Sequence, residues 1–279
     1  MADSKLTSSE SSATTLPTPP PPPPPTSGTG INSSPDNETA FDRWNRKLRM
    51  TTGLGLQSSE ERQGWLLSRC RGWKDDLVET SPVVRYLLQH ISTLPVPDSQ
   101  PSSGETSQPS ASISLPINCG ICSPVRSAGL FSPNELNPST PTGGQIKLCA
   151  ESLASKGHLE DVLSHELIHA YDHGRFAIDW TNLRHIACTE IRANALSGDC
   201  KWTREVDRHN FNFARQRQIC ARRRAILSVA QHISAGSPQP GNGDETSSSA
   251  ALASKQAEEV VDQVWSSCWN DTRPFDEIY

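Results

Sequence analysis

The segment VLSHELIHAYDHG, residues 162–174, holds three of the eight histidines of the chain and decides which fold is expected. His165 and His169 are four residues apart, so on a helix they share one face and can offer two imidazole nitrogens to one metal ion. Glu166 follows the first histidine, where it can take a proton from water at that ion. The neighbours of the pair are apolar, which predicts a buried helix: Val162, Leu163, Leu167 and Ile168. The alternative is a pair of core histidines bonded to backbone carbonyls.

A catalytic zinc ion needs a third protein ligand and one open position. His173 lies eight residues after His165, which rotates it roughly 80° away from the face of the pair. The next predicted helix, residues 182–196, carries Glu190 on a stripe of apolar and small residues. A buried carboxylate without a partner is costly, and a metal ion would be such a partner. We therefore expect Glu190 to complete the metal site.

Three further expectations concern the surroundings of this site. If Glu190 is not a metal ligand, its partner is expected to be Arg184 or Arg192, in a salt bridge. Asn194, one helical turn after Glu190, could orient a ligand histidine through a hydrogen bond. If the site hydrolyses peptides, it also needs a group that stabilises the oxyanion, for which there are three candidates: Tyr171, His173 and His185.

The order of the predicted elements indicates an α+β protein with a zincin-like metalloprotease core, mainly helical with a small β-sheet. A loop or hairpin around Cys119 and Cys122 precedes a strand at 145–150, and the histidine helix follows. That strand could hold an extended substrate through its edge. The remaining helices are expected at about 182–196, 203–232 and 254–269.

Ser, Thr and Pro-rich stretches divide the chain into a core with extensions. From the N-terminus we expect a disordered tail (1–40), a helical segment (41–94), a linker (95–115), the protease core (116–233), a second linker (234–252), and a C-terminal helix and tail that pack on the core (253–279).

The composition restricts the class of protein. A net charge of −5 gives no electrostatic case for nucleic acid as a partner, although RQRQICARRR (215–224) is locally basic. No run approaches the roughly 20 apolar residues that span a bilayer. No mitochondrial presequence is expected, because the N-terminus has no arginine before Arg43 and carries Asp3 and Glu10. The eight cysteines allow four disulfides, a metal site or buried thiols.

The segment GHLEDVLSHELIHAYDHGRFAIDWTNLRHIACTEIRANALSGDCKWTRE, residues 157–205, closely resembles the mitochondrial inner-membrane metalloprotease family that processes the precursor of ATP synthase subunit 6. The resemblance extends back through GQIKLCAE (144–151) and forward to VWSSCWNDTRPFDEIY (264–279). It implies that His165 and His169 bind zinc and that Glu166 is catalytic. It also implies that Glu190 is the downstream ligand of a glutamate-type zincin.

The same resemblance implies a location and partners. It places the chain on the intermembrane-space side of the mitochondrial inner membrane, as a peripheral protein trapped by oxidation of its cysteines, which favours disulfides. The implied substrate is the ATP synthase subunit 6 precursor, and a second implied role is assembly of the membrane sector of ATP synthase. Two alternatives are a non-proteolytic assembly factor with a structural zinc, and a nuclear metalloprotease that acts on DNA-bound protein.

Overall fold

The computed structural model describes residues 58–94, 115–124, 127–133, 144–176, 178–201, 215–236 and 243–276, and a few residues between 40 and 56. The chain divides into two units, residues 1–48 and 49–279, and every element below belongs to the second. The expected tail (1–40) and first linker (95–115) lie almost wholly outside the described residues, as does the first part of the helix expected at 203–232.

The two N-terminal helices each begin after a serine N-cap. Helix α2, Ser59–Thr80, begins after Ser58, whose hydroxyl accepts from the backbone N–H of Glu61 while the Glu61 carboxylate accepts from Ser58 N–H. This reciprocal pair is a capping box. Helix α3, Pro82–Ser92, follows Ser81 as N-cap and has proline in its first turn, where no N–H is needed.

The sheet has three strands in the order β1-β3-β2: β1 Ile117–Gly120, β2 Gly129–Pro133 and β3 Gly144–Cys149. β1 is parallel to β3 and β2 is antiparallel to it. The expected strand at 145–150 is β3, but the loop or hairpin expected before it contains β1 and β2. These strands escaped prediction because each is short and lies in a Gly- and Pro-rich region, and only pairing with β3 makes them strands. β3 is central, so its expected role as a substrate-binding edge is wrong.

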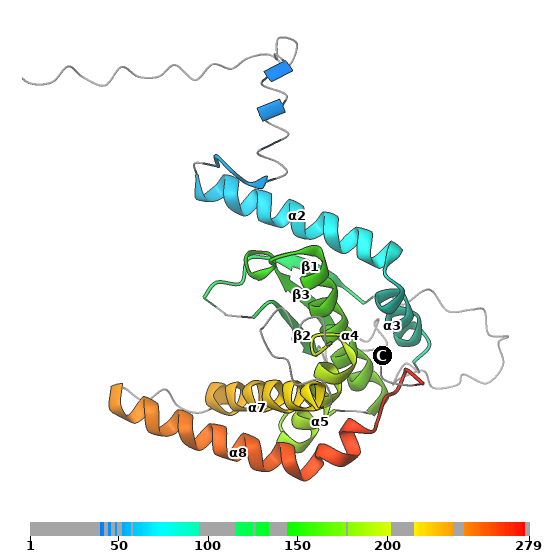
Figure 1. The fold of residues 1–279 in the computed structure, drawn as a ribbon, viewed down its shortest axis with the longest axis vertical. Coiled ribbons are helices and arrows are strands. Elements are labelled where there is room, and N and C mark those ends of the chain that lie inside the picture. The colour runs from blue at the N-terminus through cyan, green and yellow to red at the C-terminus, as the bar shows by residue number, and fades with distance from the viewer. Residues whose placement is uncertain are drawn as a thin grey trace, which may run out of the picture. The chain divides into compact units, whose positions relative to one another are not determined.

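The remaining helices are α4 (Lys156–Phe176), α5 (Leu183–Leu196), α7 (Gln216–Gly236) and α8 (Gly243–Trp269), and a 3₁₀ turn, η2 (Ala150–Ser152), joins β3 to α4. α4 packs on the sheet, on α3 and on α5, while α5, α7 and α8 pack against one another (Figure 1). This arrangement confirms the α+β, mainly helical class. None of the described helices combines the length and apolarity required to cross a membrane.

Helix α8 begins at Gly243 rather than near 254, so residues 243–252, expected in a linker, are helical. Alanine, a strong helix former, occurs at 250, 251 and 253 within this helix. Burial begins only at Ala253 and continues at Ala257, while residues 249–252 are exposed.

The described residues form two large apolar cores and one small one. The first core joins α2, α3, the sheet, α4 and the end of α5, the second joins α5, α7 and α8, and the small one contains Cys200, Cys220 and Ala221. The disulfides expected from the resemblance are present and use all eight cysteines: Cys70–Cys119, Cys122–Cys149, Cys188–Cys268 and Cys200–Cys220. The last two attach α8 to α5 and α7 to the turn that follows α5, so they tie together the helices around the site described next.

Candidate metal centre

The structure brings His165, His169 and Glu190 together. Their ligand atoms all lie within 4.8 Å of one another, and no other group of this kind occurs in the part of the chain that the structure describes. Nε2 of His165 lies 3.7 Å from Oε2 of Glu190, and Nε2 of His169 lies 3.6 Å from Oε1. Tetrahedral bonds of 2.0–2.1 Å to one zinc ion would place ligand atoms about 3.3 Å apart. The three side chains therefore fit such an ion with small adjustments.

Both elements that carry the ligands are buried helices. On α4 the two imidazole rings are 4.8 Å apart between centroids, edge to face, as expected for side chains one turn apart. α5 packs on α4 and presents Glu190 to both histidines. The expected group of two histidines and one glutamate is thus assembled by the packing of α4 against α5.

The alternatives considered for these residues do not match the contacts. Arg192 pairs with Asp172 at 2.9 Å, and Arg184 donates from Nε to the side chain of Gln263. Neither arginine forms the salt bridge with Glu190 that was the alternative to a metal site. His169 bonds through Nδ1 to the Thr189 hydroxyl rather than to a carbonyl.

Burial and mutual attraction set the charges of the ligands. Burial lowers the pKa of His169 to about 4, which favours the neutral imidazole that binds metals. Burial opposes ionisation of Glu190, but the nearby His169 and His165 outweigh it and lower the pKa of this carboxyl to about 2. Glu190 is therefore an anion, and His169 has a lone pair to offer.

Glu166 lies beside the ligands and is held by strand β2. Burial is the main cause that raises the pKa of Glu166 to about 7, near the value that suits a general base at neutral pH. Its carboxylate accepts a hydrogen bond from the backbone N–H of Phe131. A Cβ on Gly129 would stand 2.9 Å from Oε1 of Glu166 and 2.7 Å from a methyl of Val162, so only glycine allows this close approach.

A cleft of about 390 Å³ opens onto these groups. Its lining, apart from the ligands and Glu166, comes from β2, the turn before α5, α5 itself and α7: Gly129, Leu130, Phe131, Pro133, Trp180, Ile186, Ser228, Gln231 and His232. The contribution of α7 was missed, because nothing near residue 228 in the sequence resembles a protease motif.

None of the three expected oxyanion stabilisers lines this cleft. Tyr171 is buried in the first core, and His185 is exposed and accepts from the backbone N–H of Asp179 through Nδ1. His173 accepts a hydrogen bond from Nε1 of Trp180 at 3.2 Å and lies outside the ligand group. These expectations rested on nearness in sequence, whereas the cleft is built from segments that lie far apart in the chain: β2, α4, the turn before α5, α5 and α7.

Glu190 is supported by α7 and by its own helix. Asn194 donates from Nδ2 to the Glu190 carbonyl at 2.8 Å and to Oε2 at 3.4 Å, while Arg224 Nε donates to Asn194 Oδ1. The hydroxyl of Ser228 also bonds to the Glu190 carboxylate. The expectation that Asn194 orients a ligand histidine is therefore wrong, since it contacts the glutamate instead.

Sequence comparison relates the chain to known proteins. The sequence model of the peptidase M76 family matches residues 68–242 and 243–276. A protein of Malassezia globosa is 44% identical over 209 residues, which cover 75% of this chain and 76% of the relative. A protein of Mycosarcoma maydis is 44% identical over 76% of this chain and 91% of its own length, and one of Aspergillus fumigatus is 44% identical over 76% and 73%. All three are named mitochondrial inner membrane protease ATP23. No solved structure matches the chain.

Proposed function

The chain belongs to the peptidase M76 family, and we propose that it is a zinc-dependent endopeptidase. His165, His169 and Glu190 would hold the zinc ion, and Glu166 would be the general base. The observation that carries this proposal is the convergence of three ligand atoms within 4.8 Å, with Glu166 beside them in an open cleft. Two imidazoles and a carboxylate leave a fourth position for water or substrate, as in catalytic zinc sites.

The residues of the chain divide the work of peptide hydrolysis. A bound zinc ion would polarise the scissile carbonyl and lower the pKa of water. Glu166, held by Phe131 N–H against Gly129, accepts a proton from the attacking water and passes it to the leaving amine. Its pKa of about 7 suits both steps. A structural zinc site would have no use for this carboxylate, which argues against a purely non-proteolytic assembly factor.

The substrate would bind along β2. β2 pairs with β3 on one side, and its residues 129–131 and 133 line the cleft. An extended peptide can add to such an edge through main-chain hydrogen bonds. The apolar side chains of Leu130, Trp180 and Ile186 at the cleft favour a substrate with large apolar residues near the scissile bond.

The proposed location is the intermembrane-space side of the mitochondrial inner membrane, with peripheral attachment to the membrane surface. The names of the relatives support a location at the mitochondrial inner membrane, and the four disulfides are typical of a protein in an oxidising compartment. The proposed substrate is the ATP synthase subunit 6 precursor. A second proposed role is assistance in assembly of the membrane sector of ATP synthase. Both proposals rest on the family resemblance.

The nuclear alternative is disfavoured by the partners of the basic run. Arg222 bonds to Glu258 and Asp262, and Arg224 pairs with Asp199. These two arginines are neutralised within the fold, which lowers the positive charge that the run presents to DNA.

The test measures bound zinc and cleavage of a subunit 6 precursor peptide for wild type, Glu166→Gln and Glu190→Ala. We expect about one zinc per wild-type chain, loss of cleavage with retained zinc in Glu166→Gln, and loss of both in Glu190→Ala. Zinc-free wild type would contradict the metalloprotease and leave the assembly factor. Normal cleavage by Glu166→Gln would contradict the general base.

A further inference from the structure

A line of buried polar side chains runs from His169 away from the cleft. His169 Nδ1 lies 2.9 Å from the Thr189 hydroxyl, and that hydroxyl donates to Oδ2 of Asp172 at 2.8 Å. Arg192 donates to both oxygens of Asp172, from Nε and from one terminal nitrogen, at 2.9–3.1 Å. Thr189, Asp172 and Arg192 are 1–2% exposed, so water does not compete for these bonds.

The ion pair between Asp172 and Arg192 determines which group donates in each hydrogen bond of this line. Asp172 is paired with a guanidinium that stays protonated in proteins, so its carboxylate only accepts. The Thr189 hydroxyl has one proton, and it is directed to Asp172. Toward His169 the same oxygen must accept, so Nδ1 of His169 carries the ring proton. Its other nitrogen, Nε2, therefore has a lone pair and faces Glu190 and His165.

The remaining donors of Arg192 attach the line to the C-terminal segment 271–275. They bond to the backbone carbonyls of Asp271 and Arg273, and one forms a 2.7 Å ion pair with Oδ1 of Asp271. Phe275, 3% exposed, anchors this segment against the ring of Tyr86, with centroids 5.1 Å apart.

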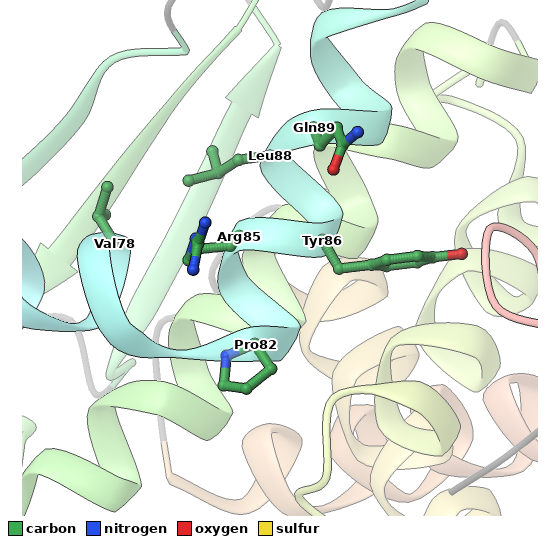
Figure 2. Close-up of a pocket in the computed structure, with 6 residues that line it drawn as sticks. All are labelled: Val78, Pro82, Arg85, Tyr86, Leu88 and Gln89. Carbon is green, nitrogen blue, oxygen red and sulfur yellow. The ribbon is translucent and has the colours of Figure 1, made fainter.

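Tyr86 fixes the segment by a second contact. Its hydroxyl donates to the carbonyl of Pro274 at 2.6 Å. Figure 2 shows Tyr86 projecting from α3 toward the C-terminal ribbon, away from Arg85 and Leu88 in the same pocket. Helix α3 is remote in sequence from the metal site, but it is linked to Arg192 through segment 271–275.

We propose that Asp172, acting through Thr189, is a positioning residue that holds His169 in the tautomer and orientation needed for zinc, and that Arg192 makes segment 271–275 part of this support. The inference rests on the proposed zinc site. A ligand histidine whose second nitrogen is fixed by a carboxylate binds metal more tightly, and loss of such a partner typically weakens binding 10- to 100-fold.

The first test removes only the linking hydroxyl. Zinc affinity is measured by competition with a chromogenic chelator on folded, metal-free protein, so that reduced stability alone does not alter the result. Thr189→Val should weaken zinc binding about 10- to 100-fold, and Thr189→Ser, which restores a hydroxyl, should return it close to wild type. Thr80→Val is the matched control, because the Thr80 hydroxyl bonds within α2 to Asp76, away from the site.

The outcomes separate this inference from the proposed function. Wild-type zinc affinity in Thr189→Val, or equal weakness in Thr189→Ser, would overturn the positioning role even if wild type binds zinc and cleaves. Absence of zinc from wild type would overturn the proposed function itself.

A second measurement tests the C-terminal part. Phe275→Ala and the milder Tyr86→Phe weaken the attachment of segment 271–275 while leaving every residue of α4 and α5 unchanged. Both should weaken zinc binding to folded protein, Phe275→Ala more than Tyr86→Phe. Unchanged affinity in folded Phe275→Ala would show that the support ends at Arg192.

Discussion

The two sides of the histidine helix α4 are built in contrasting ways. Behind His169, a dry line of hydrogen bonds passes through α5 to the C-terminal segment. Beside Glu166, the cleft is open and the support is one backbone N–H of an edge strand and the bare Cα of a glycine. One side suits the retention of a metal ion, and the other suits access of water and peptide. Variants on the two sides should therefore separate metal binding from catalysis.

The largest separation is expected between Glu166→Gln and His169→Ala. Loss of a general base typically costs 10²–10⁴ in rate, so Glu166→Gln should lower kcat/KM about 1,000-fold while zinc remains. His169→Ala removes a ligand and should abolish both zinc and cleavage. Zinc content, measured by atomic absorption, and the rate of peptide cleavage are compared for the two variants. Loss of zinc from Glu166→Gln would contradict the separation of metal binding from catalysis.

A smaller effect is expected from Gly129→Ala. The new methyl group would force Glu166 away from its position, so kcat/KM should fall about 10- to 100-fold, as for a misplaced catalytic group, with zinc retained. Gly72→Ala is the control, because a Cβ on Gly72 meets nothing within 4 Å. It should keep full activity and gain about 0.5–1 kcal/mol of stability from improved helix propensity. Equal activity of the two variants would show that β2 does not position Glu166.

Ser228→Ala should have a moderate effect on the metal side. It removes one hydrogen bond from the Glu190 carboxylate, worth about 1.5–3 kcal/mol at most for a charged partner, and should weaken zinc binding several-fold to 100-fold. Ser234→Ala is the matched control on the same helix, since the Ser234 hydroxyl bonds to the Ala230 carbonyl on an exposed face. Isothermal titration with a zinc–chelator buffer measures both, and identical affinities would contradict the role of α7.

The smallest effect is expected away from both sides. Arg222→Gln removes ion pairs with Glu258 and Asp262 that are about half exposed, and such surface pairs contribute roughly 0–1 kcal/mol. Urea denaturation should therefore show a slightly lower midpoint, with unchanged zinc binding and cleavage. A loss of zinc here would mean that the α7–α8 contact also governs the metal centre.

The site was predictable where it depends on local helical spacing. The four-residue separation of His165 and His169 places both on one face of α4 whatever packs against it. Glu190 was predictable from the cost of a carboxylate on an apolar stripe. The same signal marks Asp172, an acidic residue on a helix expected to be buried.

Other features had no local signal. Gly129 and Phe131 belong to a strand that forms by pairing with β3, and their sequence resembles a loop. Ser228 and Arg224 support Glu190 from a helix whose charged sequence indicates a solvated surface. The expected oxyanion residues failed for the converse reason: Tyr171 and His185 are near the motif in sequence but face the core and the solvent.

The sequence by itself determined the α+β class, the histidine pair with its glutamate and the choice of Glu190 as partner, because periodicity and the cost of burying charge act along single helices. Only the tertiary structure decided which cysteines pair, which strand faces the cleft and what stands behind each ligand. Those contacts join residues far apart in the chain: 20 positions separate His169 from Thr189, and 79 separate Arg192 from Asp271. No local pattern records such a contact, because it depends on how whole elements pack.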